Sequence, residues 1–370
     1  MYNDIYGEYI KNRMTNKGRK EEKIDTPIEF ERIEVENTDN NEKDNKSYEY
    51  DLIVKNGRVV IPGERVVKTN VFIKKGKIVL LGNDETISAK EVIDAEGKYV
   101  TPGIVDPHVH YGIYNSLDLD LETETSSALL GGITTSGFFI GSDGNSHLKR
   151  FPEIEYAVNE KSSIDIIPHL VIDCETQLNE LKDYVEHLGI TSFKVYMNGI
   201  PGMIPEVDDG FILDVFKELK KLRSMNDKIT LCIHTENNDI VQRNIERIKK
   251  EKGDAADIVD WTDTHPPMAE EEAVMRVAFF AEKFEMPIYI VHISSKDAIK
   301  RLEQIKKSNK FVNVETTSPY LSVNKYSIDN SLIKMEPPFR GAEDQKELWE
   351  ALCSGVVDSV GTDNVTLTTK

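Results

Sequence analysis

The spacing of apolar and polar positions changes near residue 100 of this chain. Between residues 51 and 81, short aliphatic and β-branched runs are separated by Gly57, Pro62-Gly63 and Gly76. Glycine and proline at such intervals are typical of turns between short strands. The segment therefore predicts a small antiparallel sheet, with strands near 52–54, 58–61, 70–73 and 77–81.

Beyond residue 101, apolar β-rich runs alternate with amphipathic helical segments. This alternation predicts parallel strands joined by crossover helices, and eight such units close into a (β/α)8 barrel, the TIM barrel of the α/β class. We expect the strands at 104–110, 133–139, 165–172, 192–196, 229–234, 288–292, 311–315 and 359–363. A barrel normally adds a helix after its eighth strand, so we expect the chain to be truncated after that strand.

Three regions follow from these patterns. Residues 1–48 are rich in Asp, Glu, Asn and Lys and lack apolar periodicity, which predicts an acidic, largely flexible arm. Residues 49–100 form the small sheet module, and residues 101–370 form the barrel.

The formal net charge of −19 is spread along the chain, so nucleic acid and anionic membranes are poor candidate partners. Cys174, Cys232 and Cys353 are an odd, widely separated set, which indicates buried thiols in a reducing compartment. With no apolar stretch long enough for a membrane span, the sequence predicts a cytoplasmic protein.

Histidines gather at the predicted carboxyl ends of the strands, where barrel enzymes carry their chemistry. His108 and His110 end the first strand, and alternate strand residues share a face, so both imidazoles can reach one ion. His234 and His292 end the fifth and sixth strands. Packed or hydrogen-bonded histidines are the alternative for any one of them, but four in equivalent positions favour a metal site.

Two more side chains fit the same rim. Asp363 ends the eighth strand, where a carboxylate can bind a metal with one oxygen and take a proton from water with the other; a helix cap is the alternative. Lys194 ends the fourth strand, where a neutral amine could react with carbon dioxide to give an anionic carbamate. The other four histidines are predicted to be structural or on the surface: His147, His169, His187 and His265.

Over residues 50–370 the chain resembles the amidohydrolase superfamily, most closely its hydantoinase and dihydropyrimidinase branch. The motifs that carry the resemblance occur in the family's order. They are Pro102-Gly-Ile-Val-Asp106-Pro-His108-Val-His110, Ser192-Phe-Lys194, His234-Thr-Glu236-Asn237, Val291-His292-Ile-Ser294-Ser295, Glu315-Thr316, Pro337-Pro-Phe-Arg340 and Gly361-Thr-Asp363.

The resemblance implies two divalent metal ions, usually zinc. One would be held by His108, His110 and Asp363 and the other by His234 and His292, and carbamylated Lys194 would bridge them. It also implies that the module at 49–100 is half of a β-sandwich whose other strands, returning from the C-terminus, are missing here. Tetramers are common in the family, so we expect a homo-oligomer.

The implied reaction is hydrolysis of a ring C–N bond in a cyclic amide of the hydantoin or dihydropyrimidine type, with Asp363 as the proton carrier. Tyr196, Thr317 and Asn364 are candidate substrate contacts. Two departures put the substrate in question: Gly199 replaces the family's oxyanion-donating tyrosine, and Asn364 replaces a histidine.

Three alternatives remain open. An allantoinase, or another amidohydrolase acting on a different ring amide, fits the same ligands. A dihydroorotase is disfavoured because Gly112 stands where an arginine is expected. A metal-free scaffold protein related to dihydropyrimidinases is disfavoured because all six candidate ligands are present.

Overall fold

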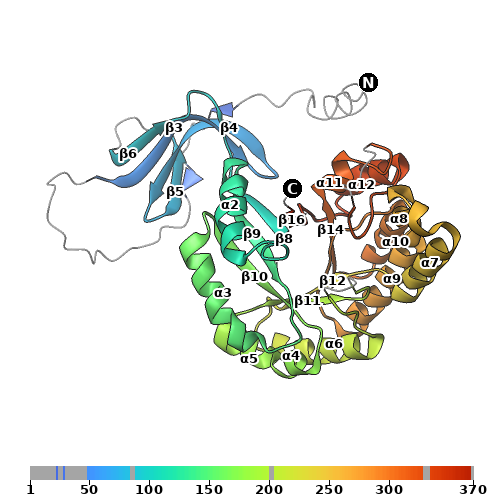
Figure 1. Ribbon diagram of the computed structural model, residues 1–370. Helices are drawn as coiled ribbons and strands as arrows, with labels where there is room; N and C mark the ends of the chain where they lie inside the picture. The colour runs from blue at the N-terminus through green and yellow to red at the C-terminus, as the bar shows by residue number, and fades with distance from the viewer. Residues whose placement is uncertain are drawn as a thin grey trace. The chain divides into compact units, whose positions relative to one another are not determined.

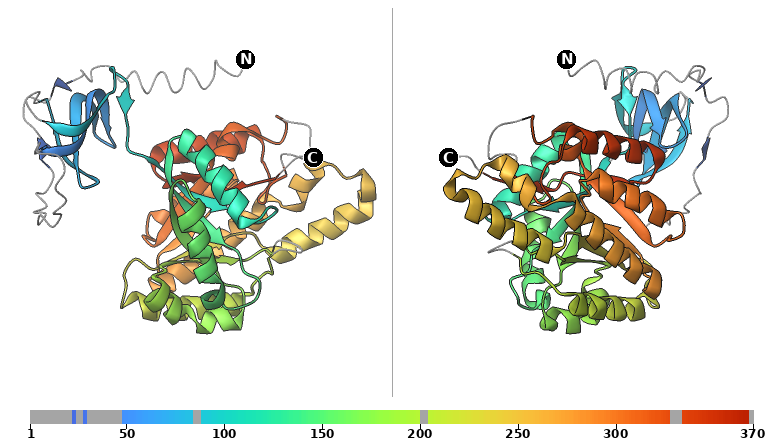
Figure 2. Two further views of the ribbon diagram at one scale, coloured as in Figure 1. Left: turned by 60° about the vertical axis from the view of Figure 1, so that its left-hand side comes forward. Right: turned by 90° about the vertical axis from the view of Figure 1, so that its right-hand side faces the viewer.

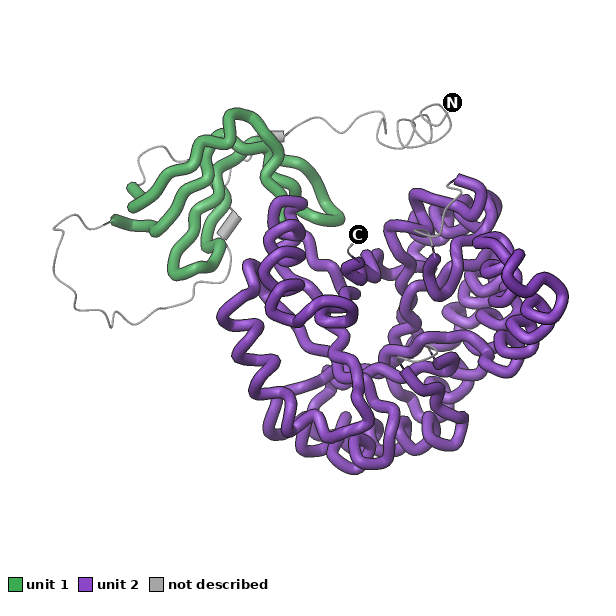
Figure 3. Tube along the Cα trace, viewed as in Figure 1, with its two compact units in different colours: residues 1–102 green, residues 103–370 purple. Residues whose placement is uncertain are grey.

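The computed structural model of this protein describes residues 22–23, 28–29, 48–83, 88–199, 204–327 and 334–367. The chain divides into two compact units, Met1–Pro102 and Gly103–Lys370 (Figure 3). The flexible arm predicted at 1–48 lies almost entirely outside the described residues, apart from two short strands, β1 (Glu22–Lys23) and β2 (Ile28–Glu29). Each unit is built around its own sheet.

The first unit is a sheet with the strand order β2-β5-β4-β3-β6, to which β1 adds beside β4 and β7 beside β3. The pairs β3–β4 and β4–β5 are antiparallel, as predicted, but β3 runs parallel to β6 and β7. The prediction of an antiparallel sheet is therefore wrong at this edge, because local sequence does not encode the direction in which a later strand returns. These strands are β3 (Tyr50–Ile61), β4 (Arg65–Lys74), β5 (Lys77–Gly82), β6 (Ala89–Asp94) and β7 (Tyr99–Val100).

The sequence predicted that Gly57 separates two strands, and this prediction is wrong. Strand β3 continues through this residue with a shift of register between Val54 and Gly57, and Asn56 adopts a positive φ of 58°. A Cβ at Gly57 would lie 2.6 Å from Cγ2 of Val100, so the glycine permits close packing against β7. A glycine inside a strand often marks such a bulge or close approach.

The second unit is a closed parallel barrel, and the predicted fold is confirmed for this part of the chain. Its sheet has the order β15-β14-β13-β12-β11-β10-β9-β8-β16. Because β15 pairs with β14 and β16 pairs with β8, these two short strands together act as the eighth strand and close the sheet on itself. The strands are β8 (Ile104–His110), β9 (Ile133–Ile140), β10 (Asp165–Val171), β11 (Ser192–Tyr196), β12 (Thr230–His234), β13 (Ile288–Ile290), β14 (Val312–Thr317), β15 (Ser359–Gly361) and β16 (Asn364–Val365).

Helices surround these strands (Figures 1 and 2). Several begin at a polar cap; for example, the side chain of Asp208 accepts from the Phe211 amide and that of Asn237 accepts from the Ile240 amide. None of the helices in the described part of the chain has the length and apolar character needed to cross a membrane. They are α2 (Leu117–Leu130), α3 (His147–Lys161), α4 (Glu175–Asn179), α5 (Leu181–Leu188), α6 (Asp209–Arg223), α7 (Asn238–Lys252), η1 (Gly253–Ala255), α8 (Ile258–Thr264), α9 (Pro267–Phe284), α10 (Lys296–Lys306), α11 (Ser318–Ser322) and α12 (Ala342–Ser354).

Successive side chains along a barrel strand point alternately to the helices and to the barrel interior. On β11, Phe193 and Val195 belong to the large apolar cluster that the strands share with the helices. Lys194 and Tyr196 occupy the alternate positions, which face the barrel interior. Both interior side chains are buried, so the fold takes a lysine and a tyrosine out of water at one end of the barrel.

Candidate metal centre and active site

Three of the predicted ligands lie together at the first and last strands. Nε2 of His108 is 3.2 Å from Nε2 of His110, and both nitrogens are 3.2 Å from Oδ1 of Asp363. Their candidate ligand atoms all lie within 4.8 Å of one another. Two imidazole nitrogens and a carboxylate oxygen converging on one point could hold a divalent metal ion.

His234 and His292 form a second pair. Nδ1 of His234 lies 3.0 Å from Nε2 of His292, although β13 ends at Ile290 and His292 follows it in a connecting segment. The ring of His292 is 5.5 Å from the ring of His108, centroid to centroid, so the two groups of candidate ligands are neighbours.

Burial favours neutral imidazoles at this site. It lowers the pKa of His110 below the ordinary value for histidine, although the hydrogen bond to Asp363 acts in the other direction. It also holds the pKa of His292 well below that value, with the nearby His234 acting in the same sense. Metal binding requires deprotonated imidazole, so both shifts suit a ligand role.

Lys194 lies between the two groups of histidines. Its Nζ is 4.7 Å from the centre of the Phe139 ring, which packs against His108, and 4.8 Å from the centre of the Tyr196 ring, which stacks near His234. The amine is fully buried and has no hydrogen-bond partner among the described residues. Burial lowers the pKa of Lys194 to about 8, so a neutral, nucleophilic amine is accessible near neutral pH.

Two of the candidate ligands sit on strained backbone. His292 has a φ of 43° and Asp363 a φ of 54°, in the left-handed region that residues other than glycine seldom adopt. Such a conformation costs on the order of 1–3 kcal/mol and persists only where the surroundings enforce it. Asp363 is held by its own amide, which donates to the His108 carbonyl at 2.9 Å.

Asp106, on β8, forms hydrogen bonds that connect β8 to the segment that follows β15. Its Oδ1 accepts from the amides of His108 at 3.2 Å and Thr362 at 3.0 Å, and its Oδ2 accepts from the Thr362 hydroxyl at 2.6 Å. These bonds fix the segments that carry His108 and Asp363.

The three candidate substrate contacts differ in their surroundings. Tyr196 is buried with its ring 5.5 Å from that of His234. Thr317 is fully buried, and its hydroxyl has no hydrogen-bond partner in the described part of the chain. The side chain of Asn364 instead donates to Glu124 Oε2 of helix α2 at 3.5 Å.

The remaining histidines were predicted to be structural or on the surface, and their surroundings differ. His147 is buried against the Val171 carbonyl at 2.7 Å, and His169 stacks on Phe139. His187 is exposed, and its ring nitrogen lies 3.6 Å from Asp183. His265 is buried and bonds to Oε1 of Glu336 at 3.0 Å.

The cysteine prediction is correct only in part. All three cysteines are free, but Cys232 alone is buried, whereas Cys174 is half-buried and Cys353 is exposed. Cys232 pairs with Lys194 in the strand register and packs inside the barrel against Phe139. Burial raises the pKa of the Cys232 thiol to about 11, so it remains a neutral, structural thiol.

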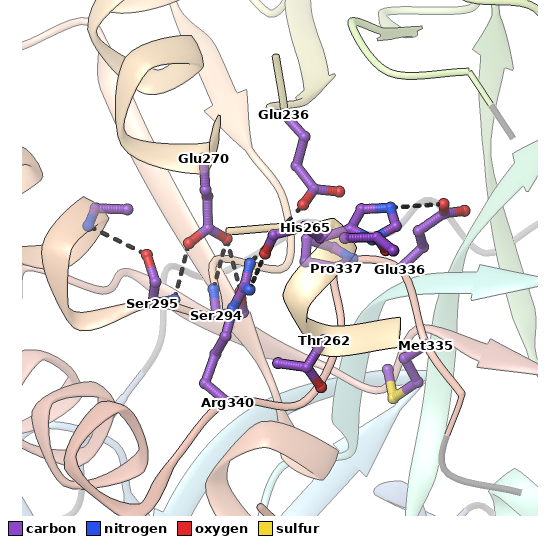
Figure 4. Close-up of polar contacts among 12 residues, drawn as sticks. Glu236, Thr262, His265, Glu270, Ser294, Ser295, Met335, Glu336, Pro337 and Arg340 are labelled. Carbon is purple, nitrogen blue, oxygen red and sulfur yellow. Dashed lines mark hydrogen bonds and ion pairs between the residues drawn. The ribbon is translucent and has the colours of Figure 1, made fainter. Parts of the chain in front are cut away.

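Sequence reasoning missed a buried polar network around Arg340, Glu236 and Glu270 (Figure 4). Glu236 Oε2 lies 3.0 Å from His234 Nε2, and Glu236 Oε1 is 3.8 Å from Nη2 of Arg340. Arg340 also donates through Nε to the Ser294 hydroxyl at 3.0 Å and through Nη1 to the His265 carbonyl. Glu270 accepts from the amide and hydroxyl of Ser294 at 2.8 and 2.9 Å.

This network joins the ends of β12 and β13, where His234 and His292 lie. Glu236 and Arg340 stand in the sequence motifs quoted above, but a motif names residues without saying which of them touch.

Comparisons with known proteins match the chain to one enzyme family. A model described as "Amidohydrolase family" matches residues 91–136. The D-hydantoinase of Ralstonia pickettii is 31% identical over 324 residues, an alignment that covers 85% of this chain and 68% of that protein. This chain belongs to the amidohydrolase superfamily, in its hydantoinase-like branch. An allantoinase of Escherichia coli is 30% identical over 336 residues, covering 85% of this chain and 69% of the relative.

Solved structures of the family superpose on the chain. The dihydropyrimidinase from Brevibacillus agri gives a TM-score of 0.77 at 28% identity, and the alignment covers 85% of this chain and 69% of that one. This amidohydrolase therefore shares the fold of that dihydropyrimidinase and spans about two thirds of the length of the relatives named here.

Proposed function

We propose that this protein hydrolyses a ring C–N bond in a small cyclic amide of the hydantoin or dihydropyrimidine type, using two divalent metal ions. The observation that carries the proposal is the convergence of His108, His110 and Asp363 beside the buried amine of Lys194. The family membership of the chain supports the same reaction class.

The donor set fits two metal ions. His108, His110 and Asp363 would hold one, and His234 and His292 the other, through the atoms whose separations are given above. Nitrogen and carboxylate donors at a barrel rim suit zinc, and they also accept manganese, cobalt or iron. When bound, the ions would lower the pKa of water and polarise the ring carbonyl.

Lys194 would supply the bridge between the two ions as a carbamate. Its neutral Nζ would attack the carbon of carbon dioxide, an N–C bond would form as one C=O π bond breaks, and the nitrogen would pass one proton to water, which leaves an anionic carbamate. The Lys194 amine is buried without a hydrogen-bond partner among the described residues, which is unfavourable. Conversion to a metal-bound carbamate would remove this unsatisfied group. The pKa of about 8 makes the required neutral form accessible.

Asp363 would carry the proton. Its Oδ1 faces His108 and His110, so Oδ2 is the oxygen that would take a proton from the attacking water and return it to the ring nitrogen as the C–N bond breaks. Coordination of Oδ1 to a divalent ion would favour the ionised form of this carboxyl, which is the form able to accept a proton.

Tyr196 would donate a hydrogen bond to the developing oxyanion in place of the tyrosine that Gly199 replaces. Burial raises the pKa of Tyr196 well above its ordinary value, which keeps the phenol protonated as a donor. Thr317, with its buried hydroxyl, would contact the ring, and Asn364 would border it beside Glu124.

Allantoin is the second candidate substrate. The allantoinase relative matches this chain at 30% identity over a length similar to that of the hydantoinases, so the comparisons do not separate the two ring systems. A metal-free scaffold is less well supported, because all six candidate ligands are present and five of them meet in two groups.

We also propose that the sheet of the first unit is half of a β-sandwich and that the protein is a homo-oligomer, both by analogy with the family. A cytoplasmic location is supported by the three free cysteines.

The test is a substrate screen on protein loaded with Zn²⁺, Mn²⁺ or Co²⁺ in the presence of bicarbonate. Hydantoins, dihydrouracil and allantoin are assayed by loss of ring absorbance, with metal-stripped protein as the control. We expect ring opening that requires the metal. Full metal loading without turnover of any ring amide would refute the reaction class.

A further inference from the structure

Glu315 is a fully buried carboxylate on β14 to which the mechanism above gives no role. Its Oε1 lies 2.8 Å from Nδ1 of His108 and accepts from the backbone amide of His292 at 3.1 Å. The Tyr289 hydroxyl donates to its Oε2 at 2.7 Å. The amide and the phenol both donate to this carboxyl group, and a carboxylate can only accept hydrogen bonds.

We propose that Glu315 is a positioning residue that holds the two halves of the metal centre in register through a single oxygen atom. His108 belongs to one group of ligands and His292 to the other, and Oε1 of Glu315 contacts both. The inference rests on the ligand assignment of the proposed function.

The contact with His108 selects its tautomer. Because the carboxylate can only accept, Nδ1 of His108 carries the proton and Nε2 keeps its lone pair. That Nε2 is the atom 3.2 Å from both His110 Nε2 and Asp363 Oδ1. A carboxylate behind a ligating imidazole also raises the basicity of the ligand nitrogen, which strengthens metal binding.

The contact with His292 acts on the backbone. His292 has a φ of 43°, a conformation that its surroundings must enforce. The bond from its amide to Glu315 supplies part of that enforcement and helps to place Nε2 of His292 at 3.0 Å from Nδ1 of His234.

Gly361 leaves the room that this arrangement needs. A Cβ at this position would lie 2.9 Å from Cβ of His108 and 3.1 Å from Cδ and Oε2 of Glu315. Any larger residue would displace the side chains of His108 and Glu315, so a glycine on β15 allows these two side chains to stay in contact.

The experiment compares wild type with Glu315→Gln, which keeps the shape of the side chain but removes its charge. In this variant the amide nitrogen can take the place of Oε2. The Tyr289 hydroxyl, which donates to Oε2 in the wild type, also lies 2.6 Å from the Ser359 hydroxyl and can reorient toward it. Affinities for Zn²⁺ and Co²⁺ are measured in bicarbonate buffer by competition with a chromophoric chelator, together with the d–d spectrum of the Co²⁺ form. We expect both ions to bind about 10–100-fold more weakly and the spectrum to change.

Asp260→Asn is the matched control. Asp260, on α8, is another buried carboxylate that bonds to Lys252 and accepts from the amide of the N-cap residue Asp257. Its contacts among the described residues include none of the candidate ligands. We expect its metal affinities to equal those of wild type.

Metal affinities of Glu315→Gln within twofold of wild type, or weakening of one ion only, would overturn the coupling role while leaving the proposed reaction intact. A wild-type chain that binds no divalent ion would overturn both. If Glu315→Gln loses its circular dichroism spectrum, Tyr289→Phe takes its place, because it removes a donor from the same carboxylate. We expect a loss of about threefold or more for that variant, and unchanged affinities would count against the role.

Discussion

His108, on β8, and Asp363, in the short connection between β15 and β16, are joined twice. The Asp363 amide donates to the His108 carbonyl at 2.9 Å, and Oδ1 of Asp363 lies 3.2 Å from Nε2 of His108. The pairing that closes the barrel therefore also brings these two candidate ligands together.

Asp363→Asn should keep the fold and much of the metal but lower kcat by about 10² or more, the scale of a general base. An amide can still offer an oxygen to the ion, but it cannot carry the proton. The measurement is kcat on the substrate that the screen identifies, alongside metal content. An Asn variant that remains active would move proton transfer to another group.

Lys194→Ala should abolish activity and weaken binding of the metal ions, with partial recovery on addition of small carboxylates. The bridge requires an anion at that point, and the truncated side chain leaves space for one where Nζ was buried. Metal content and turnover are measured with and without acetate or propionate. Retention of both ions and full turnover in the Ala variant would exclude the carbamate.

Gly199→Tyr should not restore the family's oxyanion donor. A Cβ at residue 199 would lie 2.5 Å from the Glu206 amide nitrogen and 2.8 Å from the Ile204 carbonyl, so the backbone would have to shift. We expect a loss of about 1–3 kcal/mol in stability and no gain in hydantoin turnover. Gly141→Ala is the control, because nothing lies within 4 Å of its added Cβ and its φ is not positive. Equal unfolding midpoints for the two variants would show that the backbone near Gly199 can shift at little cost in stability.

Tyr196→Phe should lower kcat by about 10²–10³ if Tyr196 donates to the oxyanion, which is the usual cost of losing such a donor. The ring would still pack against His234, so the metal content and KM should change little. Turnover equal to wild type would assign Tyr196 to packing alone. Stabilisation of the oxyanion would then fall to the metal or to backbone amides.

Arg340→Met should destabilise the barrel by about 3–5 kcal/mol, because it leaves the buried carboxylates of Glu236 and Glu270 without their shared cation. Chemical denaturation of the metal-free protein measures the loss. Arg243→Met provides the control, since the Arg243 side chain is 87% exposed and pairs with Glu246 only at 3.9 Å. A midpoint for Arg340→Met that matches the control would mean that the network contributes little to stability.

The sequence by itself determined the barrel and the residues at its rim. The period of two along each strand and the amphipathic segments between strands are local properties, so the eight strands were placed to within a few residues. The same local rule brought His108 and His110 to one face, and the shared direction of parallel strands brought His234, His292 and Asp363 to the same end.

Only the tertiary structure decided which atoms meet. Contacts between side chains on distant strands depend on register and burial, which no local pattern records. These include the contact of Glu315 with His108, the network of Arg340 with Glu236, and the isolation of the Lys194 amine from other hydrogen-bonding groups among the described residues. The parallel edge of the first sheet and the crowding at Gly199 escaped prediction for the same reason, since each depends on where a segment remote along the chain comes to lie.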